Sequence, residues 1–184
     1  MMRWIGLFAV FLVGCVQPAL SVEAYATSLE LASDAYVADA QRLSTGYQDQ
    51  VIDEIRTMIE SSPDDAASRA VGITSAATTD YLGVLADDML VFLDSVDELN
   101  PPSEISEQHE EFVAAIRSVH ESIPGTIDVV RESDSIDGIR FALTSSGFAD
   151  GQIRWTAACT SLEMAVRSLG QGIDIGCVRP EIAP

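Results

Sequence analysis

Apolar residues recur at steps of three and four from Ser21 onward, which is the spacing of one face of an α-helix. Within this first segment, Tyr25, Tyr36, Tyr47 and Met58 repeat every eleven residues. Because an eleven-residue period is close to three turns of an α-helix, the stripe stays on one side of a nearly straight helix. We interpret it as core packing rather than as a tyrosine-based site. The full stripe is Tyr25, Leu29, Ala32, Tyr36, Ala40, Leu43, Tyr47, Val51, Ile55 and Met58.

Turn-forming residues separate this helix from those that follow. Ser62 can cap a second helix and Pro63 suits its first position. That helix ends near Leu99, because the prolines at 101 and 102 cannot continue it. Its inward positions are predicted to be Tyr81, Leu85, Met89, Phe92, Val96 and Leu99.

Three more helical patterns complete the chain. A third helix begins near Glu104, and Pro124-Gly125 predicts a break or kink in it, with helix able to resume over 127–131. A short helix is expected to run to about Leu143, and the last helix over 148–169. The apolar face of the third helix is predicted to be Ile105, Phe112, Ile116, Val119 and Ile123, and that of the last to be Ile153, Ala157, Leu162 and Val166.

No pair of segments has the alternating pattern of neighbouring strands. The connections between the helices are short, so consecutive helices are expected to run antiparallel. The predicted fold is therefore an all-α, antiparallel up-and-down bundle of about four long helices. A glycine-containing turn at 170–172 ends the last helix, and 173–177 is expected to return along it as an extended tail.

The first fourteen residues have the layout of an export signal. Arg3 precedes an uncharged and mostly apolar run over 4–13, which is too short to span a bilayer. Leu12-Val13-Gly14-Cys15 resembles a bacterial lipobox, after which the cysteine is acylated and becomes the new N-terminus. This predicts a signal peptide over 1–14, a lipidated tether over 15–20 and a helical bundle domain over 21–184. The alternative is an ordinary signal peptide cleaved near residue 19 or 24, with Cys15 discarded.

The three cysteines fit this arrangement. If Cys15 carries lipid, Cys159 and Cys177 remain as an even pair. Outside the reducing cytoplasm such a pair forms a disulfide, which would hold the tail on the last helix. The alternative is two free buried thiols. A metal site is disfavoured because neither a histidine nor another cysteine lies nearby in the sequence.

A formal net charge of −19 and the absence of lysine make the body strongly acidic. Such a surface repels nucleic acid and anionic lipid headgroups, so a nucleic-acid partner is excluded. The simplest interpretation is a solvated surface, and the alternative is an acidic patch that captures a cationic partner.

No pattern of catalytic or cofactor-binding residues was found. His109 and His120 are eleven residues apart, about 16 Å along a helix, which is too far for one metal ion. Neither histidine has the glutamate three residues earlier that a di-iron bundle uses. There is no glycine-rich phosphate loop and no nucleophile elbow. We therefore expect no enzyme activity, no cofactor and no metal. If the turn at Asn100 pairs the second and third helices, His120 should lie near Asp80 or Tyr81.

Two parts of the second half resemble uncharacterised helical lipoproteins of bacteria. They are Leu99-Asn100-Pro101-Pro102 with His109 downstream, and the ending that runs from Cys159 and Leu162 through Gly172-Ile173-Asp174 to Cys177. The resemblance implies a helical extracytoplasmic body and strengthens the disulfide, but it implies no activity.

Two functions of different classes remain. The first is a lipid-anchored structural or interaction module of the bacterial envelope, held on the membrane by its lipid and facing an envelope protein partner. The alternative is a binder of a small ligand or cation, in a cavity between helices near Tyr81, His109 and His120. An envelope hydrolase is the least favoured.

Overall fold

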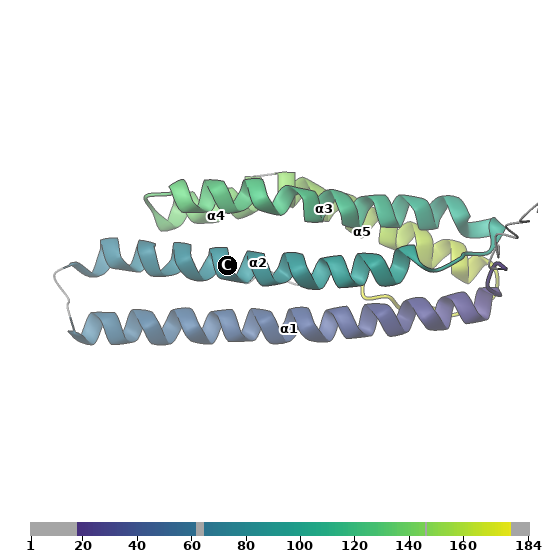
Figure 1. Cartoon of the computed structure of the whole chain (residues 1–184), viewed down its shortest axis with the longest axis horizontal. Helices are drawn as coiled ribbons and strands as arrows, with labels where there is room; N and C mark the ends of the chain where they lie inside the picture. The colour runs from purple at the N-terminus through teal and green to yellow at the C-terminus, as the bar shows by residue number, and fades with distance from the viewer. Residues whose placement is uncertain (1–17, 62–64, 146, 178–184) are drawn as a thin grey trace, which may run out of the picture.

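The computed structural model describes residues 18–61, 65–145 and 147–177, and within these ranges it contains helices and no strand. Four long helices and one short helix follow one another as an antiparallel bundle, which confirms the predicted fold class (Figure 1). They are α1 (Val22–Ser61), α2 (Ala66–Asp97), α3 (Ser106–Glu132), α4 (Ile136–Ser145) and α5 (Gly147–Ser168). A short 3-10 turn, η2 (Ser103–Ile105), precedes α3. Cys15 and the predicted signal peptide lie outside the described residues.

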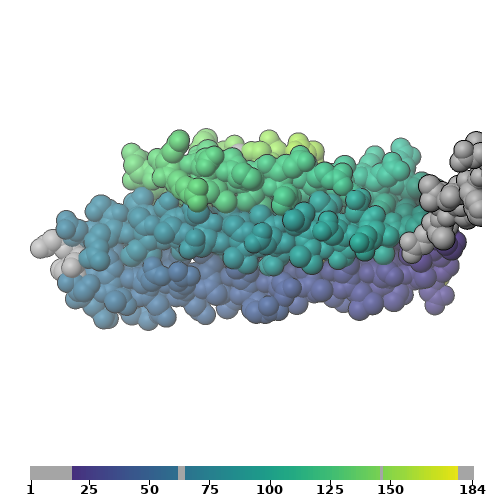
Figure 2. All heavy atoms as spheres, in the orientation of Figure 1, coloured from purple at the N-terminus to yellow at the C-terminus, as the bar shows by residue number. Residues whose placement is uncertain are grey.

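The start of α1 is tied to the turn between α2 and α3. The backbone N–H of Ala24 donates to Ser21 Oγ at 3.2 Å, so Ser21 caps the first turn of the helix. The backbone N–H of Leu20 donates to the carbonyl oxygen of Asn100 at 2.9 Å. The first described residues therefore lie at the same end of the bundle as the α2–α3 turn. At the opposite end, the α1–α2 hairpin extends beyond α3 and α4 (Figures 1 and 2).

α3 runs from Ser106 to Glu132 with Pro124 inside it. Of the break or kink expected at Pro124-Gly125, the break is therefore wrong, and the kink stays a prediction. Proline removes one helical hydrogen bond. However, Ile123 on one side of Pro124 and Val130 on the other are both fully buried in the core. We attribute the continuity of α3 to this packing, because tertiary burial of an apolar face contributes more to helix stability than local propensity does.

The N-terminal half of α5 turns a different face toward the core than the sequence predicted. Leu162 and Val166 are buried as expected, but Ile153 is 54 % exposed and Ala157 is also exposed, so these two assignments are wrong. The reason lies at Gly151, where a Cβ would stand only 3.0 Å from Val119 Cγ2 on α3. This position needs glycine because α5 approaches α3 closely there. With Gly151 against α3, Ile153 two residues later points to solvent.

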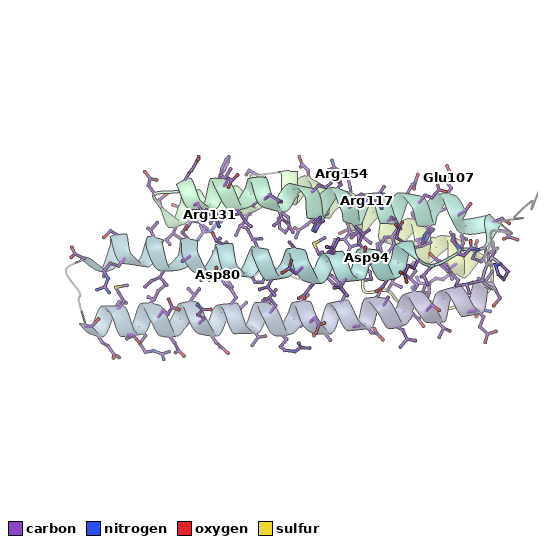
Figure 3. All side chains as sticks on the ribbon, in the orientation of Figure 1. Asp80, Asp94, Glu107, Arg117, Arg131 and Arg154 are labelled. Carbon is purple, nitrogen blue, oxygen red and sulfur yellow. A yellow bond between two sulfur atoms is a disulfide. The ribbon has the colours of Figure 1, made fainter. Side chains whose placement is uncertain are left out.

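The core runs along the bundle and the charges cover its outside. The largest fully buried side chains come from α1, α2, η2, α3 and α5, and the six charged residues labelled in Figure 3 are all exposed. Among the polar contacts that tie α3 to its neighbours, Arg154 donates to Ser118 Oγ at 3.0 Å and Ser75 Oγ donates to the Val130 carbonyl at 3.1 Å. Over the described ranges, no helix is long and apolar enough to cross a membrane.

A candidate ligand pocket between α1 and α5

An apolar pocket of about 300 Å³ lies between α1 and α5. α1 contributes Ser33, Tyr36, Val37, Ala40 and Gln41 to it, and no charged side chain is among the described residues that line it. Its volume is at the lower end of the range for small-molecule sites, which are concave and mostly apolar with a few placed polar groups. The pocket therefore has the size and composition of a small-ligand site.

Aromatic rings from four helices meet at the pocket. Tyr36 and Phe92 stack nearly parallel, with centroids 4.8 Å apart and planes at 17°. The Trp155 ring lies 5.6 Å from Tyr36 at a tilt of 50°, and Phe112 meets the edge of Phe92 at 6.2 Å. Burial of the Tyr36 hydroxyl raises its pKa, with smaller contributions from Tyr81 and Asp88, so this tyrosine stays neutral. The rings provide uncharged flat walls.

Ser33 is the polar exception in this apolar surrounding. Its side chain is 2 % exposed, and its Oγ has no hydrogen-bond partner among the described residues. An unpaired buried hydroxyl is destabilising by about 1–3 kcal/mol, so proteins rarely retain one without a reason. By contrast, the Thr156 hydroxyl across the pocket already donates to the Gln152 carbonyl at 2.9 Å. Among the described lining residues, Ser33 is thus the one with a buried hydroxyl that lacks a partner.

The C-terminal tail forms the remaining wall of the pocket through Ile175, Gly176 and Cys177. α5 ends at Ser168, and the chain reverses at Gly170, which has a positive φ of 86°. The predicted disulfide between Cys159 and Cys177 is present, with the two Cα atoms 5.5 Å apart. It joins the tail to α5, and its sulfur atoms belong to the pocket wall because both cysteines line it.

Backbone hydrogen bonds hold the tail against both helices. The N–H of Ile175 donates to the Glu163 carboxylate on α5, and the N–H of Asp174 donates to the Glu30 carboxylate on α1, each at 3.0 Å. Arg167 donates to the Ile173 carbonyl at 2.8 Å. At Gly176 the backbone has a φ of +62°, and a Cβ there would meet Val37 on α1 at 3.2 Å. The tail therefore bridges α1 and α5 and closes the space between them.

The candidate residues from the sequence lie elsewhere. Tyr81 packs on Tyr47, with ring centroids 5.1 Å apart, and lines a shallow open groove between α1 and α2. His109 is paired with Tyr25. Because Tyr25 and Tyr47 are twenty-two residues apart on α1, about 33 Å of helix separates the two contacts. The structure does not bring Tyr81 and His109 together, and neither of them, nor His120, lines the α1/α5 pocket.

His109 has a structural environment of its own. It is 5 % exposed, and its Nδ1 shares a hydrogen bond of 2.9 Å with the hydroxyl of the fully buried Tyr25. Burial lowers the pKa of His109, although Asp97 and Glu110 act in the opposite direction. Burial also raises the pKa of Tyr25. Both partners are therefore held neutral, as expected for a satisfied core pair. His120 is half-buried, and its proximity to Asp80 or Tyr81 stays a prediction.

Acidification is expected to destabilise the bundle through His109. A histidine whose pKa is lowered by folding binds its proton more readily in the unfolded chain, so the free energy of unfolding falls as the pH drops below the unfolded value of about 6.5. Urea denaturation between pH 7 and pH 5 measures this slope. His109→Gln should flatten it, and His120→Gln on the same helix is the control. If only the His120 variant flattened the slope, the assignment to His109 would be wrong.

Metal binding has no support in the described side chains. No group of three or more His, Cys, Asp or Glu residues among them lies close enough to hold a metal ion. The groove beside Tyr81 contains Asp39, Asp80 and Asp88 with Arg42, and it is open to solvent. Desolvation raises the pKa of Asp88 and nearby Asp39 adds to the rise. The groove is open and Arg42 lies among its carboxylates, so it is a weaker candidate than the apolar pocket.

One feature of the sequence indicates the pocket, although the predicted site did not include it. Ser33 lies between Leu29 and Tyr36 at helical spacing, so a serine stands within an otherwise apolar stripe. The predicted apolar stripe contains Ala32 at this turn of the helix instead. The contributions of Trp155 and the tail had no such signal, because they depend on how α5 is rotated and on where the disulfide places residues 175–177.

The described residues form a helical bundle, and the tail closes one side of its apolar pocket. A comparison with protein-family models, curated proteins and solved structures found no match.

Proposed function

We propose that this chain is a lipid-anchored extracytoplasmic binding protein that holds a small apolar molecule in the pocket between α1 and α5. The observation that carries the proposal is the Ser33 hydroxyl, which is buried at the pocket without a hydrogen-bond partner. A ligand that pairs with this hydroxyl removes the penalty of leaving it unpaired. The proposed ligand pocket is a different cavity from the one near Tyr81, His109 and His120 that the sequence suggested.

The tether is supported by the order of features along the chain. The lipobox-like Leu12-Val13-Gly14-Cys15 follows a short apolar run, and α1 begins seven positions after Cys15. The tether is therefore short, and the bundle would stand close to the membrane that holds the lipid. A disulfide such as Cys159–Cys177 is typical of proteins outside the cytoplasm. Two or more acyl chains on Cys15 would make the attachment durable.

The experiment begins with protein purified from the membrane fraction. Intact-mass spectrometry should give a chain that begins at Cys15 and carries acyl groups, and an unmodified chain that begins at Met1 would overturn the tether. The same protein is then reconstituted into vesicles of neutral phospholipid. Trp155 is the only tryptophan after Cys15, so its emission reports on the pocket.

Binding is measured by energy transfer from Trp155 to N-phenyl-1-naphthylamine, a neutral apolar dye. We expect saturable transfer for the wild-type protein and at least a tenfold weaker affinity for Ala40→Leu, because the larger side chain fills part of the pocket. Ala40 is 4 % exposed and lines the pocket, whereas Ala38 on the same helix is exposed, so Ala38→Leu is the matched control. Helical circular dichroism checks that each variant is folded. Equal transfer for all three proteins would show that the dye binds elsewhere and would reject the pocket.

A further inference from the structure

We infer that the α1/α5 pocket takes an uncharged, flat molecule of one or two rings that forms a single hydrogen bond with Ser33 Oγ. This inference rests on the proposed function, because it names the class of ligand for the same pocket. It follows from the charge of the lining residues, from the shape of the walls and from Ser33 Oγ, the one buried side-chain polar atom without a hydrogen-bond partner among the described residues.

The charge of the ligand is limited by the lining. The described residues around the pocket are apolar, aromatic or neutral polar, and the disulfide contributes to the wall. A charged group transferred from water into such surroundings without a partner is strongly disfavoured. The chain as a whole has a formal net charge of −19, which further repels an anion. A neutral ligand avoids both the cost of transferring a charge from water and the repulsion by the acidic chain.

The shape of the ligand is limited by the rings and the volume. Tyr36 and Phe92 are stacked at 17°, and Trp155 lies at 35° to Phe92. Aromatic rings gain most from another ring that packs on a face or an edge at defined geometry. A volume of about 300 Å³ corresponds to about ten water molecules, each of about 30 Å³. One or two fused rings fill that space, whereas a long acyl chain is too large.

The single hydrogen bond is expected to discriminate between ligands. A site that offers a buried polar group rejects an analogue that lacks the matching group, because the protein's group then stays unpaired. Gln41 is exposed and Gln152 is half-buried, so water can satisfy their side chains, and the Thr156 hydroxyl already donates to the backbone carbonyl of Gln152. The discrimination should therefore depend on Ser33.

Five probes test these limits by calorimetric titration of the full-length protein in neutral vesicles, with protein-free vesicles subtracted. They are 2-naphthol, naphthalene, 2-naphthoate, 1-decanol and the cation phenyltrimethylammonium. We expect 2-naphthol to bind most tightly and naphthalene about tenfold more weakly. Ser33→Ala should remove that difference. Ser95 is an exposed helical serine whose hydroxyl donates to the Val91 carbonyl, so Ser95→Ala is the matched control and should preserve the difference.

The outcomes separate this inference from the proposed function. If none of the five probes binds and the dye also fails, the pocket is not a ligand site and the proposed function is rejected. If 2-naphthoate, 1-decanol or the cation binds more tightly than 2-naphthol, the pocket stands and the ligand class is wrong. If 2-naphthol and naphthalene bind with the same affinity to the wild-type protein as well as to Ser33→Ala, then Ser33 does not discriminate between the two ligands and its proposed role is overturned.

Discussion

Replacing both Cys159 and Cys177 by alanine is expected to lower the free energy of unfolding by about 3 kcal/mol. The disulfide closes a loop across a sequence separation of 18 residues. In the chain-entropy model, a cross-link over a loop of this length stabilises the fold by about 3 kcal/mol, because it restricts the unfolded chain. Urea denaturation followed by helical circular dichroism measures the loss.

The same substitution is expected to open the pocket. Without the disulfide, the described part of the tail keeps its hydrogen bonds from Ile175 to Glu163, from Asp174 to Glu30 and from Arg167 to Ile173. It also keeps the burial of Ile173 and Ile175, but it loses its covalent link to α5. Ile175 and Cys177 form one wall of the pocket, so a tail that detaches exposes the apolar lining to water. Energy transfer from Trp155 to the dye should therefore weaken together with stability.

Two controls define this result. Reduction of the wild-type protein breaks the same bond without changing any side chain, so it should reproduce both effects. Thr160→Ala changes an exposed residue of α5 next to Cys159 and should leave stability within about 0.5 kcal/mol of wild type. If the double alanine variant were as stable as wild type and bound the dye equally well, the tail would have no part in closing the pocket.

The helices were predictable from the sequence because their signal is local. The repeat of Tyr25, Tyr36, Tyr47 and Met58 specified one face of α1, and Tyr25, Tyr36 and Met58 are buried there. The prolines after Asn100 marked the α2–α3 turn for a similar reason, since one residue type decides where a helix ends. Cysteine parity predicted the disulfide without any knowledge of the fold.

Which face each helix turns toward the core was less predictable, because it depends on contacts between distant segments. Gly151 decides which face of α5 meets α3, and the cost of a side chain at this position is set by Val119 on another helix. Pro124 suggested a break that the burial of Ile123 and Val130 overrides. Both errors arise where tertiary packing opposes a local preference.

The separation of Tyr81 and His109 could have been predicted with more use of the α2–α3 turn. In an antiparallel pair, residues at equal distance from the turn lie side by side, and Tyr81 is much further from the turn at Asn100 than His109 is. The pocket itself could not be found in this way. It is formed mainly between α1 on one side and α5 with the tail on the other, and α1 is remote in sequence from both, with no short turn that fixes its register against them.

Phe112→Ala is expected to lower the free energy of unfolding by about 3–5 kcal/mol, the usual loss when a buried phenylalanine is truncated. Phe112 is 1 % exposed, contacts the edge of Phe92 and lines the pocket. Its removal joins a new cavity to the existing one, so the loss includes both the transfer of the ring and the unfilled volume. Phe112→Leu should lose less, and it provides a folded variant if the alanine variant does not fold.

Phe141 provides a matched control for this prediction. It has the same side chain on α4 but is 66 % exposed, so Phe141→Ala should change stability by no more than about 0.5 kcal/mol. Urea denaturation of the four proteins under one condition compares them directly. A loss at Phe112 as small as the one expected at Phe141 would contradict the assignment of Phe112 to the core. Because the α1/α5 pocket takes one of its walls from Phe112, that result would also remove the aromatic surface on which a flat ligand is expected to pack.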